Sequence, residues 1–310
     1  MIEIFPQALA HGITLSCRAA GVVGRPVLMF LHGFPEAAFV WDALLEHFAL
    51  PAHGGYRCVA PNLRGFERSS APVEASAYRP KHLVQDIAAL VALQTRTDNG
   101  QPGGGAVACL IAHDWGGAVA WNLANQKPEL ASKLAIVNSP HPGTFLRELK
   151  SNPRQQAASA YMNFLVRPDA EQLLAQDDFR RMWRFFTESG TGAQSASWLT
   201  EDLKALYRDV WNRGLTGGCN YYRASPLRPP RGDDPGAANL DLPRSMLTVD
   251  LPTLLIWAMN DVALLPELVD GLDDYVKQLT VKRVADASHW IVHEQPQRVI
   301  RLLDDFLHQP

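Results

Sequence analysis

An aspartate at position 114 lies in the segment 111–117 (IAHDWGG), where a small-x-nucleophile-x-Gly turn ordinarily carries a serine. An apolar run over residues 106–112 precedes it, and residues 116–124 follow with helical spacing. This order predicts a strand, a sharp turn and a helix, with the turn projecting one side chain from the edge of a sheet. Ala112 replaces the first glycine of such turns, which is a mild departure.

The choice of aspartate determines which chemistry this turn could perform. A carboxyl group with an ordinary pKa of about 3.9 is ionised at neutral pH, so Asp114 needs no base before it attacks. Attack on an ester or amide would give a reactive anhydride, whereas displacement at a saturated carbon gives an ordinary alkyl ester. Epoxides and alkyl halides are therefore the expected electrophiles. The alternative is that Asp114 only caps the helix that begins at Trp115.

A second segment, 31–36 (LHGFPE), follows an apolar run and could complete the site. A loop at this place directs a backbone N–H above the nucleophile, and the residue after the nucleophile supplies another. Phe34 and Trp115, both acting through their backbone, are the candidates for an oxyanion hole. The bond between Phe34 and Pro35 is either trans, the usual form, or cis. A simple strand-to-helix turn would also explain this segment.

Two further segments carry a candidate acid and a candidate base. Asp261 ends the apolar segment 256–261, and His289 lies in the segment 285–290 near the C-terminus. Together with Asp114 they follow the chain order nucleophile, acid, base. We expect His289 to act as the general base and Asp261 to orient it and to stabilise the imidazolium. The weaker alternatives for the acid and the base are Asp250, Asp286 and His293.

A sheet must position these candidates, and the chain shows the alternation that such a sheet requires. The 310 residues are 47% hydrophobic and 20% charged, which is enough for a large core. Short β-type runs alternate with helical patterns, which predicts an α/β fold with a mostly parallel, doubly wound sheet. Each run ends at a candidate functional loop, as expected when ligands bind beyond the carboxyl ends of strands. The predicted strands are 26–31, 56–60, 107–112, 134–138 and 253–257.

The pattern changes to amphipathic helical stretches between residues 142 and 244. This predicts a helical cap, 142–244, inserted into a core domain of residues 1–141 and 245–310. A Gly/Pro-rich segment from 214 to 236 is expected to return to the core as an extended loop. The helical stretches of the cap are 155–166, 170–186 and 198–211.

Composition excludes several other classes of protein. The formal charge of −3 and the scattered basic residues give no reason to expect a nucleic-acid or membrane partner. No apolar run approaches membrane-spanning length, and the N-terminus lacks a signal-like pattern, so we expect a cytoplasmic protein. The chemistry expected of Asp114 is also expected to use no metal or organic cofactor. Four cysteines without CxxC spacing are expected to be reduced thiols: Cys17, Cys58, Cys109 and Cys219.

Over nearly its whole length, the chain resembles the epoxide hydrolases of the α/β-hydrolase fold. Asn62 and Ser288 stand where that family usually has Asp and often has Gly, and we interpret both as structural variation. The resemblance implies two cap tyrosines, Tyr161, seven residues before a proline, and Tyr222, in a segment similar to Asn-Trp-Tyr-Arg. The motifs that carry the resemblance are 32–36 (HGFPE), 59–65 (VAPNLRG), 113–117 (HDWGG), 138–142 (NSPHP), the acid loop at Asp261 and 288–290 (SHW).

The two tyrosines suit the opening of an epoxide. The ring oxygen becomes an alkoxide, and a tyrosine hydroxyl with a pKa near 10 can donate to it at neutral pH. We therefore expect Tyr161 and Tyr222 to hold and protonate this oxygen, although either could serve only in packing. Arg223 is expected to anchor the cap by an ion pair. The expected substrate contacts are Phe34, Trp115, His113 and Tyr221.

Dehalogenases with the same nucleophile are the main alternative. Haloalkane dehalogenases often hold the halide with an asparagine where this chain has Phe34. Fluoroacetate dehalogenases bind the substrate carboxylate with arginines at the two positions where this chain has Trp115 and Ala118. Arg64 is a possible substitute for these arginines, but we expect it to be structural. A carboxylate buried without a cation is strongly disfavoured, so a haloacid fits poorly.

We therefore expect hydrolysis of an apolar epoxide to a vicinal diol through an alkyl ester on Asp114. Water activated by His289 and Asp261 would then hydrolyse that ester. A non-catalytic ligand-binding protein is a further alternative, because one fold can host unrelated functions. A homodimer formed through the cap or the outer helices is compatible with the chain.

Overall fold

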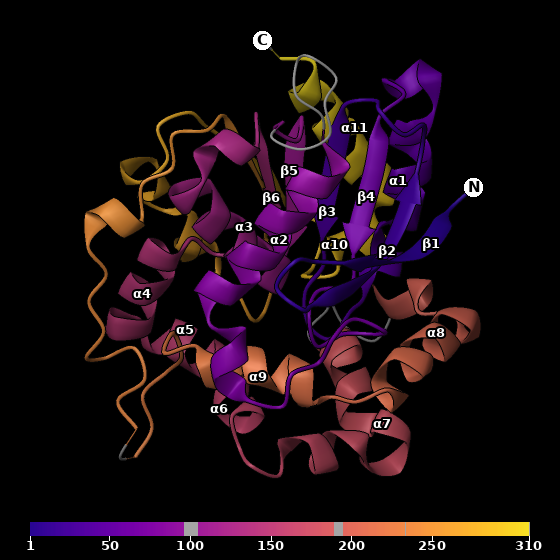
Figure 1. Ribbon diagram of the computed structural model, residues 1–310. Helices are drawn as coiled ribbons and strands as arrows, with labels where there is room; N and C mark the ends of the chain where they lie inside the picture. Colours follow the sequence, from indigo (N-terminus) through magenta and orange to yellow (C-terminus); the bar gives the residue numbers. More distant parts are fainter. Residues whose placement is uncertain (96–104, 189–194, 233, 310) are drawn as a thin grey trace.

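The computed structural model describes residues 1–95, 105–188, 195–232 and 234–309 (Figure 1). Its centre is an eight-stranded sheet with the order β1-β2-β4-β3-β5-β6-β7-β8. β1 and β2 pair antiparallel at one edge, β2 runs antiparallel to β4, and the remaining neighbours are parallel. The strands are β1 Glu3–Ala8, β2 Thr14–Ala20, β3 Val27–Leu31, β4 Arg57–Pro61, β5 Cys109–His113, β6 Leu134–Val137, β7 Thr253–Ala258 and β8 Leu279–Val284.

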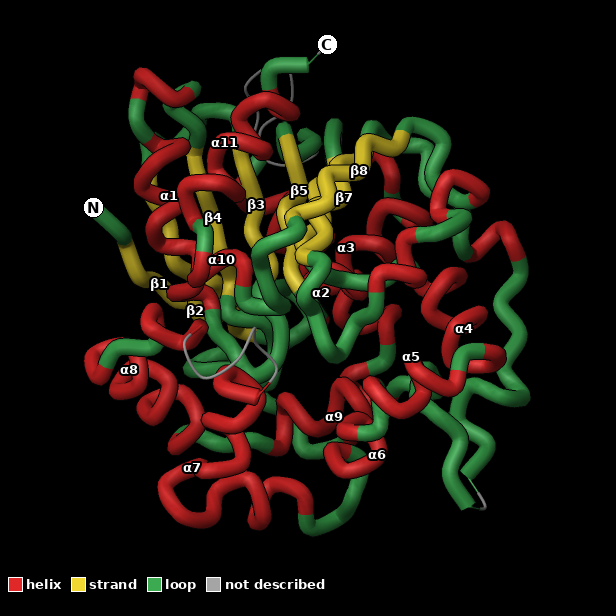
Figure 2. Tube along the Cα trace, turned by 180° about the vertical axis from the view of Figure 1, so that it is seen from behind, coloured by secondary structure: helices red, strands yellow, loops and turns green. Residues whose placement is uncertain are grey.

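Helices cover both faces of this sheet, which confirms the doubly wound α/β architecture. Figures 1 and 2 show α2 and α3 on one face and α1 and α11 on the other. Alternate residues of β5 serve the two faces: Leu110 and Ala112 belong to one apolar core, Cys109 and Ile111 to the other. The helices are α1 Asp42–Ala49, α2 Pro80–Gln94, α3 Trp115–Gln126, α4 Pro142–Ser151, α5 Pro153–Ala158, α6 Tyr161–Leu165, α7 Ala170–Glu188, α8 Glu201–Asn212, α9 Thr216–Ala224, α10 Ile291–Glu294 and α11 Pro296–Leu307.

The five predicted strands are all present, displaced by two residues at most. They are β3 to β7, and each is buried along its entire length. Sequence reasoning did not anticipate β1, β2 and β8. β1 and β8 lie at the edges of the sheet and are largely exposed or half-buried, so they lack the continuous apolar run that marks a central strand.

The helical region after β6 differs in detail from the expectation. The stretch 155–166 is two helices, because bonds from Ala160 N to Ala157 O and from Met162 N to Ser159 O tighten the chain between α5 and α6. α8 begins at Glu201 rather than at 198, because the Thr200 hydroxyl caps it by accepting from a backbone N–H.

The Gly/Pro-rich segment is also not wholly a loop, because its first part forms α9. The glycines serve close packing there. A Cβ on Gly217 would lie 2.3 Å from the Cα of Gly65, and a Cβ on Gly218 would lie 2.8 Å from the Phe34 ring. These contacts place α9 directly against the loops that follow β3 and β4. Figures 1 and 2 show α5 to α9 together beyond the carboxyl ends of the parallel strands.

Candidate active site

Asp114 lies in the sharp turn between β5 and α3, with φ 49° and ψ −121°. Two close approaches hold the turn. A Cβ on Gly116 would lie 2.4 Å from the Leu31 carbonyl oxygen, and one on Gly117 would lie 2.3 Å from the Ser139 Cβ. The Ser139 hydroxyl donates to the Asp114 carbonyl at 2.7 Å. The Asp114 side chain makes no capping bond to α3, so the alternative of a helix cap is not supported and the carboxylate is available for chemistry.

The loop after β3 brings a backbone donor to this carboxylate. The Phe34 N–H donates to Asp114 Oδ1 at 2.8 Å, and the Phe34–Pro35 bond is cis. A Cβ on Gly33 would lie 2.2 Å from the same oxygen, which is why glycine is required there. Phe34 therefore has the geometry expected of one oxyanion donor, and the contribution of the Trp115 N–H stays a prediction.

The loops after β7 and β8 bring the acid and the base together. His289 Nδ1 lies 2.6 Å from Asp261 Oδ2, and His289 Nε2 lies 3.8 Å from Asp114 Oδ2. The other Asp261 oxygen accepts from the backbone N–H groups of Ala263 and Leu264 at 2.9 Å each. The weaker alternatives lie elsewhere: Asp250 and Asp286 are exposed and pair with lysine and arginine, and His293 bonds to Glu36.

Neighbouring charges shift the pKa of both His289 and Asp261. Burial by itself would lower the pKa of His289, but Asp261, aided by Asp114 and Glu36, outweighs burial and raises this pKa to about 9. Burial by itself would raise the pKa of Asp261, but His289 and the hydrogen-bond donors around the carboxylate keep it lowered. Asp261 therefore stays ionised and holds the proton on Nδ1 of the imidazole.

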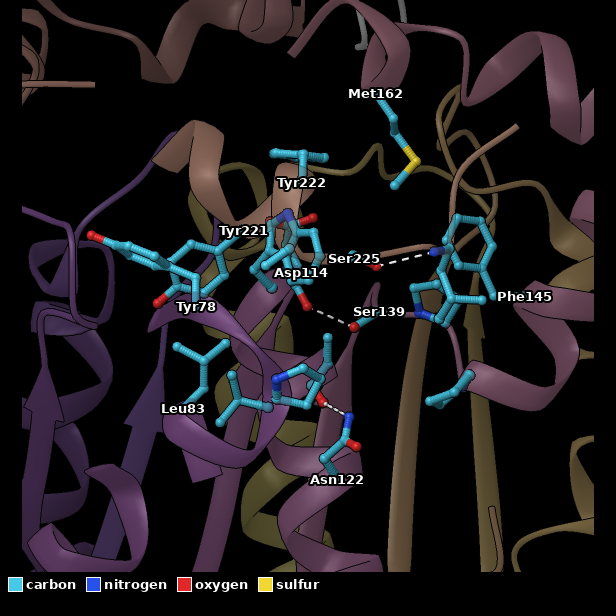
Figure 3. Close-up of a pocket in the computed structure, with 18 of the residues that line it drawn as sticks. Tyr78, Leu83, Asp114, Asn122, Ser139, Phe145, Met162, Tyr221, Tyr222 and Ser225 are labelled. Carbon is cyan, nitrogen blue, oxygen red and sulfur yellow. Dashed lines mark hydrogen bonds between the residues drawn. The ribbon is translucent and has the colours of Figure 1, made fainter. Parts of the chain in front are cut away.

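Two cavities of the described structure meet at the nucleophile. Asp114, Tyr161 and Tyr222 line both of them. The first, shown in Figure 3, encloses about 790 Å³ including its opening, and Trp115 and Tyr221 are among its walls. The second encloses about 760 Å³ including its opening. It contains His289 and is further lined by Phe34, Pro35, Ala157, Ala158, Phe185, Val262, Ala263 and Trp290.

The hydroxyl groups of Tyr161 and Tyr222 keep their protons in this setting. Burial raises the pKa of both Tyr161 and Tyr222, and the nearby Asp114 carboxylate raises it further. Their rings pack edge to face with centroids 6.0 Å apart, on α6 and α9 respectively. Two hydroxyls that keep their protons thus share the cavity walls with one carboxylate.

Two residues expected to contact substrate, His113 and Tyr221, form hydrogen bonds to other parts of the protein. His113 lines neither cavity, because its ring is buried between Glu36 Oε2, 3.1 Å from Nδ1, and the His289 carbonyl, 3.0 Å from Nε2. This corrects the expectation that His113 touches substrate. The Tyr221 ring lines the first cavity, but its hydroxyl donates to the Arg64 carbonyl at 3.1 Å.

The residues expected to be structural have that role. Arg64 and Asp86 form a buried pair, with 4% and 3% of their side chains exposed. Arg223 Nη2 donates to Glu171 Oε2 at 2.8 Å and ties α9 to α7. The four cysteines are free and buried, as expected of reduced core thiols.

Sequence reasoning missed two polar residues that support the triad. Asn138 Nδ2 donates to Asp261 Oδ2 at 2.9 Å, while its Oδ1 accepts from the Ala258 N–H at 2.9 Å. Glu36 is 1% exposed and contacts the histidines near the base. Both lie in motifs already noted, 138–142 and 32–36, but only the three-dimensional structure shows what their side chains face.

Within the described ranges, no group of three or more His, Cys, Asp and Glu side chains has a geometry that could hold a metal ion. Within the same ranges, no helix has both the length and the apolar character needed to cross a bilayer.

Comparison with known proteins agrees with this geometry. Residues 26–296 match the family model described as the alpha/beta hydrolase fold. Human epoxide hydrolase 4 is 33% identical over 303 residues, which cover 96% of this chain and 76% of that protein. The AB hydrolase superfamily protein YfhM of Bacillus subtilis is 33% identical over 96% of this chain and 95% of its own length. A crystal structure of Bacillus megaterium epoxide hydrolase with an inhibitor superposes with a TM-score of 0.84 at 28% identity, covering 98% and 100% of the two chains.

The chain therefore belongs to the α/β-hydrolase-fold family. Within that family it groups with the epoxide hydrolases, as the resemblance of its motifs predicted.

Proposed function

We propose that this protein hydrolyses an apolar epoxide to a vicinal diol. The observation that carries the proposal is that one carboxylate, Asp114, shares its cavity walls with two tyrosines, the half-buried Tyr161 and the buried Tyr222. A serine hydrolase needs no such donors opposite its oxyanion hole. An epoxide needs them, because its ring oxygen must leave the attacked carbon as an alkoxide and take up a proton.

The first step is ring opening. Asp114 Oδ1 already accepts from the Phe34 N–H, so Oδ2 is the oxygen free to attack. Oδ2 forms a bond to one ring carbon while the bond from that carbon to the ring oxygen breaks. Tyr161 and Tyr222 donate hydrogen bonds to the leaving oxygen, and one of them passes its proton to it. The product is a hydroxyalkyl ester of Asp114.

The second step is hydrolysis of this ester. His289 Nε2 removes a proton from water, and the water oxygen attacks Cγ of Asp114. The charge that develops on Oδ1 lies 2.8 Å from the Phe34 nitrogen, the position of an oxyanion donor. The bond between Cγ and the alkyl oxygen then breaks, His289 passes its proton to that oxygen, and the diol leaves. The other proton of the water returns to the tyrosine that gave one up in ring opening. Asp114 keeps one oxygen from water.

Dehalogenation fits these residues less well. A haloacid substrate would need a cation next to the nucleophile, and Trp115 and Ala118 occupy those positions. Arg64 cannot supply this cation, because its guanidinium group already donates to Asp86 and to backbone carbonyls. A purely ligand-binding role is disfavoured because nucleophile, acid and base lie within reach of one another.

The test is the intact mass of His289→Gln protein after incubation with epoxides, haloalkanes and haloacetates, followed by peptide mapping. We expect an adduct with the mass of a whole epoxide on Asp114, because ring opening expels no leaving group. The matched control, His289→Gln combined with Asp114→Asn, should carry no adduct. An adduct lighter than its reagent by hydrogen halide would identify a dehalogenase, and no adduct with any reagent would contradict covalent catalysis.

We further propose that residues 142–244 act as the cap, supplying both tyrosines and closing the cavities from above. A cytoplasmic location and a homodimer stay predictions. Fractionation of the cells and light scattering of the purified protein would test them.

A further inference from the structure

The cap helices α7 and α8 bind the core at points next to the catalytic groups. Trp211 Nε1 on α8 donates to the Pro35 carbonyl at 2.8 Å, one residue after the oxyanion donor Phe34. Trp290 Nε1 donates to the Phe185 carbonyl on α7 at 3.1 Å, and Trp290 directly follows the base His289. These contacts of α7 and α8 therefore reach the two loops that serve ester hydrolysis.

A third contact runs through the buried carboxylate of Glu36. The Tyr207 hydroxyl on α8 donates to Glu36 Oε1 at 3.1 Å, and His293 Nε2 lies 2.8 Å from the same oxygen. Glu36 Oε2 lies 3.1 Å from His113, whose other ring nitrogen donates to the His289 carbonyl at 3.0 Å. Glu36 thus connects the cap to the loop of the base by two routes, since His293 belongs to α10 just beyond that loop.

The groups that bond to the Glu36 carboxylate keep it ionised although it is buried. Burial would raise the pKa of Glu36, but the bonds to His113 and His293 outweigh burial and hold this pKa well below its ordinary value. Burial and the neighbouring Glu36 raise the pKa of Tyr207 far above its ordinary value, so its hydroxyl remains a donor. Removal of one donor from a buried carboxylate is costly, and the groups that remain must move to compensate.

The tyrosines of ring opening lie on other helices than α8. Tyr161 is on α6 and Tyr222 on α9, and both helices contact α7, where the Phe185 ring lies 6.0 Å from that of Tyr161. Tyr207 and Trp211 line neither cavity at the nucleophile. α8 thus reaches the loops of Phe34 and His289 but supplies no wall of either cavity.

We propose that α8, with His293 of α10, positions the groups of the second step, so that Tyr207, Trp211 and His293 are positioning residues for ester hydrolysis and not for ring opening. This rests on the proposed function, because it assumes an ester on Asp114. The reason is that the oxyanion on Oδ1 and the proton transfer to His289 arise only when the ester is hydrolysed, and α8 bonds to Pro35 and Glu36 beside these groups. Small displacements of such groups slow a reaction severely.

The experiment measures the two steps separately by rapid quenching and intact mass, with Tyr207→Phe and Trp211→Phe. For both variants we expect ester formation within about twofold of the native rate and ester decay slower by about tenfold or more. The pH profile of decay should also shift, because the loop of His289 is displaced. The matched control is Tyr56→Phe, directly before β4 and so at the end of the sheet opposite the catalytic loops, which should leave both rates unchanged.

A conservative pair keeps the test valid if a variant fails to fold. His293→Gln keeps a donor toward Glu36, so its ester should decay at close to the native rate. His293→Leu removes this donor, so its ester should decay slowly. Equal slowing of both steps, or native decay in folded Tyr207→Phe and Trp211→Phe, would overturn the inference. Failure of the proposed function looks different, since then neither the native protein nor His289→Gln would form an ester.

Discussion

The charge on Asp114 should control the basicity of His289, and this can be tested with Asp114→Asn. In the free protein the pKa of His289 is raised to about 9, so at pH 7 it is largely an imidazolium that cannot accept a proton from water. Esterification neutralises Asp114 and removes one of the charges that favour the imidazolium. The asparagine variant imitates that loss of charge with little change in shape.

The distance between the two groups sets the size of the effect. At the 3.8 Å that separates His289 Nε2 from Asp114 Oδ2, the attraction is between about 1 and 4 kcal/mol for effective dielectric constants of roughly 80 to 20. This corresponds to roughly one to three pKa units. Removal of a negative charge lowers the pKa of a cationic acid, so the pKa of His289 should fall from about 9 toward neutrality. Alkylation would thereby produce the base that the second step needs.

The assay is an NMR titration of the His289 ring in the native and Asp114→Asn proteins, with resonances assigned by comparison with His289→Gln. Asp273→Asn, which removes an exposed carboxylate in the 3₁₀ helix Leu272–Asp274, is the control and should leave the titration unchanged. A His289 that still titrates near 9 in Asp114→Asn would refute the reasoning. It would mean that Asp261 and Glu36 alone maintain the raised pKa.

Three other results are expected. Tyr222→Phe removes one donor to the ring oxygen and should slow ester formation by about 10²–10³-fold in rapid-quench measurements, with little effect on ester decay; equal slowing of both steps would contradict this role. Gly217→Ala places a methyl group 2.3 Å from the Gly65 Cα, so α9 must shift and the melting temperature should fall by at least about 2 °C, whereas an unchanged value would show that α9 packs more loosely. Asp86→Ala leaves Arg64 buried without its partner and should lower the free energy of unfolding by about 3–5 kcal/mol in urea, and a loss below about 1 kcal/mol would mean that Arg64 reaches water.

The central strands and the order of the motifs were predictable from the sequence because each is marked by residues that are neighbours in the chain. A buried parallel strand must be apolar along its length, so β3 to β7 are readable as runs of residues. Edge strands such as β1 and β8 have no such run. The beginning of α9 was missed for a related reason: Gly217 and Gly218 indicate a loop when read locally, but they are required by the approach of α9 to another segment.

In the candidate triad, too, some features were readable from the sequence and others only from the tertiary structure. The sequence by itself determined the type and order of Asp114, Asp261 and His289, because carboxylate and imidazole chemistry depends on side-chain type. Only the tertiary structure decided what each faces. Glu36 and Asn138 bond groups far away in the chain, so no local pattern could assign their partners, and His113 turned out to hold the loop of the base. Chemistry is encoded in residue types, whereas the distances that make it work arise only when distant strands end at one edge of a sheet.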